Sequence, residues 1–251
     1  MTMQEYEKLF LNAPSNCDAI IDASTSYFTM PEAIDAILAY QPDAKFIIML
    51  RNPIDLVYSL HSENLFLGRE KEVEFANAWE LQDLRREGRY VPVSCQNPKM
   101  LLYRDQALLG QALSYLLERV ERHQIHWIFF EDLATKPANC YQEVLSFLGL
   151  PNDNRQHFNS LNQSKIHRYP ELNRILRTLG IWRAKLGLPG IGLRARFNRG
   201  VATPKERTPL TPEMRWELYQ AFHNDIELLS QLTKRNLSNW MPPNPMQNKS
   251  S

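Results

Sequence analysis

The stretch Lys45-Phe46-Ile47-Ile48-Met49-Leu50-Arg51-Asn52-Pro53 decides the fold class of this chain. Its run of consecutive apolar residues is typical of a strand that is covered on both faces, as in a parallel sheet. Arg51 and Asn52 end the predicted strand, and Pro53 opens a helix, because proline is favoured in the first helical turn. A strand followed directly by a helix is the repeating unit of an α/β fold.

Further strands and helices are predicted on either side of this stretch. Strands are expected at residues 19–23 and 125–130, with Glu131 and Asp132 at the end of the second, and helices are expected to open at Pro31, Pro137 and Pro212 and to span residues 109–120. Gly149 and Thr211 stand where a C-cap glycine and an N-cap threonine belong. Residues 151–208 keep no clear period and are expected to be loop-rich and basic. The alternation predicts a parallel sheet flanked by helices.

Composition excludes several classes of protein. The chain has 251 residues, of which 43% are hydrophobic and 23% charged, as in an ordinary globular protein. The formal net charge of +1 disfavours a general nucleic-acid binder. No apolar run approaches the roughly 18–20 residues of a membrane span, and the first residues do not form a signal peptide. Three widely spaced cysteines predict no metal site and favour a reducing, cytoplasmic location.

Arg51 stands at a place where α/β proteins bind ligands. In open sheets of this class, ligands bind beyond the carboxyl ends of the strands. The helix opened by Pro53 presents backbone N–H groups there, and Ser59 follows on that helix. A guanidinium, a hydroxyl and a helix N-terminus suit a phosphate group. The residues alone leave a second interpretation open, in which Arg51 forms a surface ion pair with Asp55.

The run from Pro42 to Ser59 resembles the 3′-phosphate-binding segment of sulfotransferases that use 3′-phosphoadenosine 5′-phosphosulfate (PAPS). In that family the segment reads P-x-A-K, an apolar strand, and then L-R-N-P-x-D-x-x-x-S. The resemblance implies that Arg51 and Ser59 bind the 3′-phosphate of PAPS. It is strongest to the branch of the heparan sulfate sulfotransferases and their bacterial relatives, and it covers roughly Asp22 to Trp240.

Other segments carry the same resemblance. Ile128–Leu133 with Phe147–Pro151 is similar to the family's strand, E-D-L, helix, F-L-G-L unit, and a C-terminal pattern of Leu210, Thr211, Pro212, Arg215, Leu218, Phe222, Asp225 and Trp240 recurs in bacterial relatives. Ser164–Glu171 resembles the S-K-G-R-x-Y-P loop that closes over the nucleotide, with Ile166 and His167 in place of the Gly-Arg pair. This implies that Lys165 and Arg168 bind the nucleotide. Solvated loop charge is the alternative interpretation.

The chain departs from the family pattern in its N-terminal part. The first glycine is Gly68, so the Lys-x-Gly-Thr-Thr/Ser-like loop that holds the 5′-phosphosulfate is missing. Where the family has E-K-S-P-x-Y, this sequence reads Asp22-Ala23-Ser24-Thr25-Ser26-Tyr27, with Ala23 at the lysine position. We expect the first strand and the phosphate loop to be absent, the natural reading frame to extend upstream of Met1, and this chain to transfer sulfate poorly.

The resemblance implies a P-loop nucleotide-binding type of parallel sheet, in a single domain over residues 1–240 with a flexible tail at 241–251. The implied activity is transfer of a sulfuryl group from PAPS, as co-substrate and without a metal, to a hydroxyl or amine of a small-molecule or carbohydrate acceptor. The catalytic base is unassigned, because lone histidines such as His61 and His126 are more often structural. The alternative is a non-catalytic nucleotide-binding remnant or interaction module. A nucleotide-kinase-like activity also lacks its phosphate loop and a magnesium motif.

Overall fold

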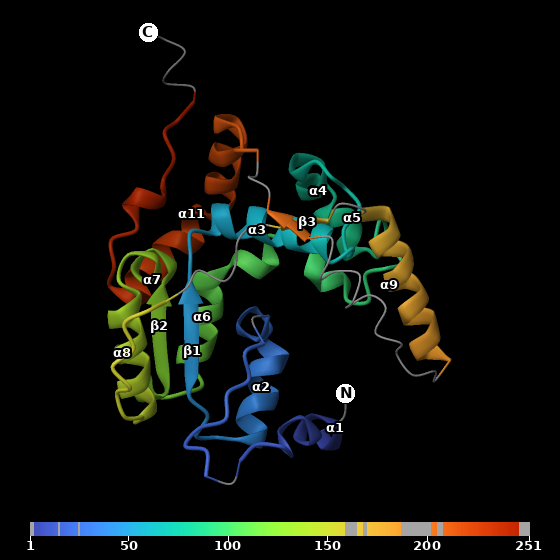
Figure 1. Cartoon of the computed structure of the whole chain (residues 1–251). Coiled ribbons are helices and arrows are strands. Elements are labelled where there is room, and N and C mark those ends of the chain that lie inside the picture. The colour runs from blue at the N-terminus through green and yellow to red at the C-terminus, as the bar shows by residue number, and fades with distance from the viewer. Residues whose placement is uncertain are drawn as a thin grey trace. The chain divides into compact units, whose positions relative to one another are not determined.

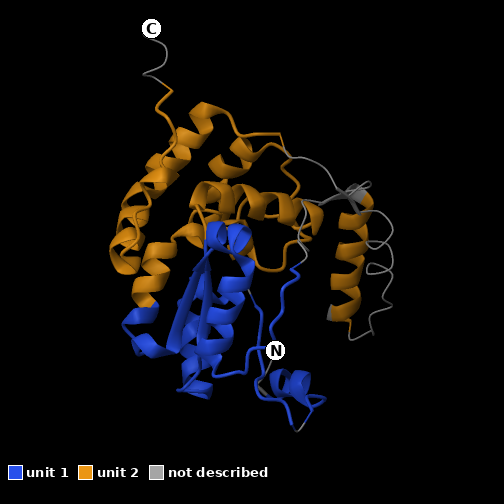
Figure 2. Ribbon diagram, turned by 60° about the vertical axis from the view of Figure 1, so that its left-hand side comes forward, with its two compact units in different colours: residues 1–50, 116–159 blue, residues 51–115, 160–251 orange. Residues whose placement is uncertain are grey.

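The chain forms two compact units, which Figure 2 shows in different colours. The computed structural model describes residues 3–14, 16–24, 26–158, 165–167, 170–186, 202–204 and 208–245. Unit 1 comprises residues 1–50 and 116–159, and unit 2 comprises residues 51–115 and 160–251. The first boundary therefore separates the strand that ends at Leu50 from Arg51. A single domain over residues 1–240 stays a prediction.

Each unit has its own helices and strands (Figure 1). Unit 1 contains α1 (Met3–Glu7), α2 (Pro31–Tyr40), β1 (Phe46–Leu50), β2 (Ile125–Phe129), α7 (Phe130–Thr135) and α8 (Pro137–Leu148). Unit 2 contains α3 (Pro53–Phe66), α4 (Phe75–Glu80), α5 (Gln82–Arg86), β3 (Lys165–His167), α9 (Pro170–Lys185), β4 (Ala202–Pro204) and α11 (Pro212–Thr233). Helix α6 (Leu109–Leu117) begins in unit 2 and ends in unit 1.

The two strands of unit 1 form the predicted parallel pair. Phe46 lies opposite Ile125, and Leu50 lies opposite Phe129. Helices α7 and α8 pack against β2 (Figure 1). The ammonium group of Lys45 donates to the backbone oxygen of Phe147 at 2.8 Å and so ties the start of β1 to the end of α8. The α/β fold with a parallel sheet flanked by helices is confirmed.

The burial of β1 differs from the prediction. Ile48 and Leu50 are buried, but 36% of Ile47 and 44% of Met49 is exposed. The expectation of two covered faces is therefore wrong for this strand. A continuous apolar run shows that a strand is apolar on both sides, but it does not show which side has a packing partner.

The strand expected at residues 19–23 is absent from the described part of this region. These residues have no regular secondary structure, and 59% of Ile20 and 61% of Ile21 is exposed. A strand exists only where a neighbour pairs with its backbone N–H and C=O groups. Apolar composition alone could not supply that neighbour.

Proline, glycine and threonine signals place the helices correctly. Helices α2, α3, α8 and α11 begin at the four prolines from which they were predicted. Gly149 ends α8 with a φ of 76°, and the side chain of Thr211 accepts a hydrogen bond from the Met214 N–H at 3.2 Å. These signals act within one or two turns of the chain, so the sequence reveals them directly.

Two local predictions are wrong. Glu131 and Asp132 lie in the first turn of α7 rather than at the end of a strand. The stretch expected to be loop-rich contains α9, a helix of 16 residues. Apolar residues do recur on α9 at Leu172, Ile175, Leu179 and Trp182. Because the many arginines dominate this stretch, the composition conceals a helical period.

Helices α6 and α11 are joined by a buried carboxylate. Asp225 accepts hydrogen bonds from the backbone N–H groups of Gly110 and Gln111, each at 2.8 Å. A carboxylate satisfies the free N–H groups of a helix start and is favoured by the helix dipole. Asp225 therefore caps α6 from a helix distant in the sequence.

Among the described residues no helix combines the length and the apolar character that a membrane crossing requires.

Candidate functional site

The candidate site is built on the turn that follows β1. Asn52 is the N-cap of α3, and its side-chain oxygen accepts the backbone N–H of Ile54 at 3.0 Å. Pro53 occupies the first helical position, where its missing N–H costs nothing. The amide nitrogen of Asn52, which is buried, donates to the backbone oxygen of Trp240 at 3.5 Å. The residue after Arg51 is thus fixed by its own helix and by the C-terminal segment.

Helix α3 separates a buried face from a partly exposed one. Its buried residues are Pro53, Ile54, Val57, His61 and Asn64. Ser59 and Asp55 are half-buried and lie four residues apart, which places them on one face of the helix. Arg51, just before the N-cap, is also half-buried. The two predicted ligands, Arg51 and Ser59, are therefore partly accessible and lie on a helix and turn that are held in place.

Asp55 forms its ion pair with a residue other than Arg51. Its carboxylate lies 3.1 Å from the guanidinium of Arg215 on α11. The sequence left open an ion pair between Arg51 and Asp55, and in the structure Arg215 is an ion-pair partner of Asp55. Arg215 belongs to the C-terminal pattern of the sequence, but no role could be given to it there because its partner lies 160 residues away.

The segment that carries Lys165 lies beside α3. Residues 165–167 form strand β3, which pairs antiparallel with β4 and packs against α3 (Figure 1). Lys165 is opposite Pro204 in this pair. These three residues form a strand rather than the expected loop, because β4 supplies a backbone partner. The structure thus brings the backbone of Lys165 near the helix of Ser59, whereas Arg168 lies outside the described residues.

A hydrogen bond fixes the chain that follows β4. The Tyr58 hydroxyl donates to the backbone oxygen of Thr208 at 2.6 Å. Thr208 precedes the N-cap of α11, whose Arg215 pairs with Asp55. Helix α3 therefore contacts β3 and the start of α11 through neighbouring residues.

His61 is a structural residue. It is 2% exposed, its Nε2 lies 2.9 Å from the backbone oxygen of Glu72, and its ring makes edge contacts with Phe75 and Tyr103. Burial lowers the pKa of His61 and favours the neutral ring. Because the ring is buried and makes this contact, it cannot take a proton from a bound substrate. The expectation that His61 is structural is confirmed.

The segment around Ala23 forms a local turn. Asp22 accepts hydrogen bonds from the Ser24 backbone N–H at 3.0 Å, from the Ser24 hydroxyl at 2.7 Å and from the Tyr6 hydroxyl at 3.0 Å. Burial acts to raise the pKa of Asp22, but these hydrogen bonds outweigh it and lower the pKa. Burial and the bond to Asp22 raise the pKa of Tyr6 to about 12. An aspartate with a lowered pKa is a weak general base.

A metal centre is not evident in the part of the chain that the structure describes. There, no group of three or more His, Cys, Asp or Glu side chains is placed to hold an ion. Cys95 and Cys140 are buried, and burial raises the pKa of both thiols. Such thiols are poor nucleophiles. The polar groups that remain at the candidate site suit an anion held by a guanidinium and a hydroxyl.

Comparison with known proteins identifies the family. The model of the sulfotransferase domain matches residues 30–233, which include Arg51, Ser59, Lys165 and Arg168. No curated protein matches the chain closely enough to count as a relative. The crystal structure of a sulfotransferase from Alicyclobacillus acidocaldarius is 23% identical, with a TM-score of 0.66 over 95% of this chain and 74% of that one.

A second solved structure is more distant. The sulfotransferase domain from the curacin biosynthetic pathway is 19% identical, covers 93% of this chain and 68% of its own, and gives a TM-score of 0.44. The structural similarity to the Alicyclobacillus acidocaldarius enzyme supports the fold, and the match of the family model over most of the sequence supports the family. This chain belongs to the sulfotransferase domain family.

Proposed function

We propose that this chain binds PAPS and takes part in transfer of its sulfuryl group to a hydroxyl or amine of a small-molecule or carbohydrate acceptor. The observation that carries the proposal is the position of Arg51 and Ser59. Arg51 follows the last residue of β1 and directly precedes Asn52, the N-cap of α3. Ser59 lies on the partly exposed face of that helix. Strand ends and helix starts of this kind are the common phosphate sites of α/β proteins.

Each proposed ligand has a distinct part in holding the nucleotide. The planar guanidinium of Arg51 suits two parallel hydrogen bonds to oxygens of the 3′-phosphate, and the hydroxyl of Ser59 suits a third. The packing of β3 against α3 supports a contribution from Lys165 to the same nucleotide. Arg168 follows three residues later in the sequence and would add a second cation.

The chemistry of transfer indicates which groups the reaction requires. A bond forms between the acceptor oxygen or nitrogen and sulfur, the bond from sulfur to the 5′-phosphate oxygen breaks, and the acceptor loses a proton. The 3′ end of PAPS fits the groups at the strand–helix turn. The 5′ end needs a cation and a nest of backbone N–H groups, and Ala23 stands at the position where the resembled family has a lysine. Because alanine cannot neutralise the 5′-phosphosulfate, we expect slow transfer by this chain.

A second function has an observation in its favour. Ala23 and the hydrogen-bonded turn of Asp22 and Ser24 occupy the region where the resembled family places a lysine. A protein that keeps the 3′-phosphate site but lacks this lysine could bind nucleotide without transferring sulfate. This alternative shares the nucleotide site, so only a transfer measurement separates the two functions.

The test combines binding with transfer. Binding of 3′,5′-adenosine bisphosphate is measured by calorimetry, and transfer from ³⁵S-labelled PAPS is measured with a panel of hydroxyl- and amine-bearing sugars. Saturable binding with transfer above the rate without protein supports the proposed function. Binding without transfer supports the non-catalytic alternative. If the bisphosphate at millimolar concentration does not bind, both functions are wrong.

A further inference from the structure

Helix α9 of unit 2 exposes a stripe of large apolar side chains. The stripe consists of Leu172, Ile175, Leu179, Trp182 and Leu186, of which the last directly follows the helix. Between 42% and 70% of each of these residues is exposed. They recur at intervals of three and four residues, which places them on one face of the helix. None of them belongs to the nucleotide site proposed above, so the stripe requires its own explanation.

The opposite face of α9 is attached to unit 2 by polar groups. The side chain of Asn173, which is fully buried, donates to the backbone oxygen of Phe66 at 2.7 Å. The Nε atom of Arg177 donates to the backbone oxygen of Ser94 at 2.6 Å. With about 3.6 residues per turn, Asn173 and Arg177 lie roughly opposite the apolar stripe. Helix α9 thus turns a polar face inward and an apolar face outward, the reverse of an ordinary surface helix.

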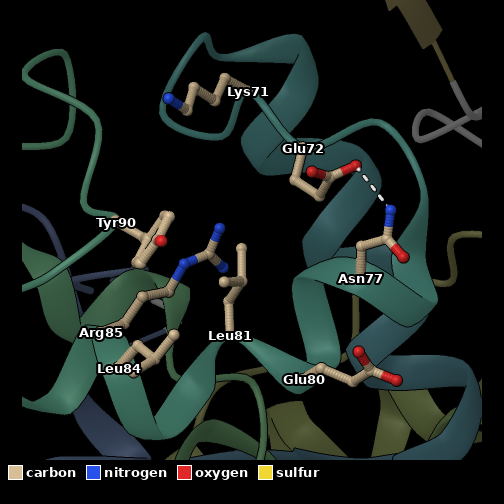
Figure 3. A pocket seen from close by; sticks show the side chains of 8 residues that line it. All are labelled: Lys71, Glu72, Asn77, Glu80, Leu81, Leu84, Arg85 and Tyr90. Carbon is tan, nitrogen blue, oxygen red and sulfur yellow. Dashed lines mark hydrogen bonds between the residues drawn. The ribbon is translucent and has the colours of Figure 1, made fainter.

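The part of unit 2 that holds α9 is itself fixed. Gly68 lies so close to α9 that a Cβ atom there would be 3.3 Å from Cγ of Arg174. Just after Gly68, the two carboxylate oxygens of the buried Glu70 each lie 2.8 Å from a terminal nitrogen of Arg85. The next turn is tied by the side chain of Asn77, which donates to the carboxylate of Glu72 at 3.4 Å (Figure 3). A buried bidentate pair restrains both of its segments, so the polar contacts of α9 determine which face it exposes.

The composition of α9 indicates what its exposed face contacts. Single exposed apolar residues are ordinary, but a contiguous group of them marks an interaction surface. The helix has four basic residues and one acidic residue in its sequence. Arg183 follows Leu179 by four residues and so lies beside the stripe. The stripe contains Trp182, and tryptophan favours the boundary between apolar and aqueous surroundings. A basic, tryptophan-containing apolar face is typical of a helix that lies on an anionic membrane surface.

A second copy of the chain is a poorer match for this face than a lipid surface. At about 1.5 Å per residue the stripe is about 21 Å long, and at a helix width of about 10 Å it covers about 200 Å². A stable dimer buries about 800 Å² on each partner. Two copies of the same basic helix would also repel each other. Anionic lipids, in contrast, offer acyl chains to the stripe and negative headgroups to the basic residues.

We propose that α9 docks on the surface of a membrane that contains anionic lipids. The apolar stripe from Leu172 to Leu186 enters the boundary between the headgroups and the acyl chains, and the basic residues of the helix face the headgroups. The helix lies along the surface and does not cross the membrane. This inference adds a place of action to the chain and does not depend on the nucleotide site.

Co-sedimentation with vesicles tests the proposal. The full-length chain, without nucleotide, is mixed with vesicles of phosphatidylcholine alone or of phosphatidylcholine with phosphatidylserine. We expect saturable binding to the vesicles with phosphatidylserine and at least about fivefold weaker binding to phosphatidylcholine alone. Added salt should weaken the first binding, because it screens exposed charges. Equal binding to the two kinds of vesicle, or no binding to either, would overturn the proposal.

Matched variants locate the contact on α9. The double variant Leu179→Gln with Trp182→Gln should bind the anionic vesicles at least about tenfold more weakly, because it removes two apolar side chains from the stripe. Both residues are more than half exposed, so the fold should be kept, which circular dichroism checks. The control Leu11→Gln changes a leucine of unit 1 that is 75% exposed and should bind like the wild type. If the double variant behaves like this control, the stripe is not the membrane contact.

A conservative variant provides a spectroscopic readout. Tryptophan emission of the wild type should move to shorter wavelength when anionic vesicles are added, because Trp182 leaves water. Trp182→Phe keeps the stripe apolar, so it should still co-sediment but lose this shift. A shift of wild-type size in Trp182→Phe would contradict insertion of the stripe.

Sedimentation without vesicles examines the alternative occupant. We expect the chain to show no dimer that the double variant abolishes. Such a dimer, together with no binding to vesicles, would assign the stripe to a second copy of the chain and overturn the proposal.

Discussion

Arg51 has two possible roles from the sequence, as a ligand of the 3′-phosphate or as a surface ion-pair residue, and a single substitution distinguishes them. If its guanidinium holds the 3′-phosphate, then Arg51→Ala removes a charge-assisted pair of hydrogen bonds, worth about 1.5–3 kcal/mol. We expect the variant to bind 3′,5′-adenosine bisphosphate about tenfold more weakly. Binding of 5′-AMP, which has no 3′-phosphate, should barely change. Calorimetry with the two ligands measures the difference.

The control for this prediction is another half-exposed arginine. Arg119 is 33% exposed and pairs with Asp35 at 3.2 Å, far in sequence from the strand–helix turn. Arg119→Ala should leave the affinity for both nucleotides unchanged. Equal losses for the bisphosphate and for 5′-AMP in Arg51→Ala would mean that Arg51 does not recognise the 3′-phosphate.

At the scale of elements, the contact between α6 and α11 depends on a glycine. A Cβ atom on Gly110 would lie 2.4 Å from the backbone oxygen of Asp225, where no side chain fits without movement of the helix. Alanine gains about 1 kcal/mol of helix propensity over glycine, but the clash is with backbone. We expect Gly110→Ala to reduce the free energy of unfolding by about 1–3 kcal/mol, measured by urea denaturation.

A second helical glycine supplies the control for this substitution. Gly180 lies within α9, and a Cβ atom there would meet no atom within 4 Å. Gly180→Ala should leave the free energy of unfolding unchanged or raise it by up to about 1 kcal/mol. Similar effects of the two substitutions would show that α6 and α11 are not in close contact at Gly110.

The Asp225 cap also predicts a dependence of stability on pH. Burial raises the pKa of Asp225, although the backbone N–H groups of Gly110 and Gln111 act in the opposite direction. The folded protein then holds this proton more tightly than the unfolded chain does. The contribution of Asp225 to stability is therefore greatest below about pH 4 and falls as the pH rises through the raised pKa.

Asp225→Asn tests this direction, because asparagine does not titrate. We expect the difference in unfolding free energy between wild type and variant to shift against the wild type as the pH rises from 4 to 7. Urea denaturation at each pH measures it. A difference that moves toward the wild type over this range would show that the hydrogen bonds from α6 outweigh burial.

The elements that the sequence predicted are those with local signals. Proline and threonine mark the starts of α3 and α11, and the positions of Arg51 at the turn after β1 and of Ser59 on α3 follow from the same signals. The features that could not be predicted depend on distant residues. Asp225 lies 115 residues from Gly110, and β3 exists because β4 pairs with it. Neither partner can be recognised from spacing along the chain.

At the scale of the whole molecule, the predicted nucleotide ligands fall in one unit. Residues 51–115 and 160–251 form unit 2, and they include Arg51, Ser59, Lys165 and Arg168. The parallel strands β1 and β2 belong to unit 1. If these four residues bind the nucleotide, its stabilising effect should be concentrated in unit 2.

Hydrogen exchange with saturating 3′,5′-adenosine bisphosphate tests this distribution. Amides in residues 51–62 and 160–170 should exchange more slowly when the ligand is bound. A ligand that binds the folded segment but not its locally unfolded form makes local unfolding rarer. Amides of β2 at residues 125–129 should change far less, and they serve as the internal reference. Protection restricted to residues 51–62 would retain Arg51 and Ser59 as ligands and remove Lys165 and Arg168. Equal protection in both units would mean that binding acts on the fold as a whole, and it would contradict a nucleotide site contained in unit 2.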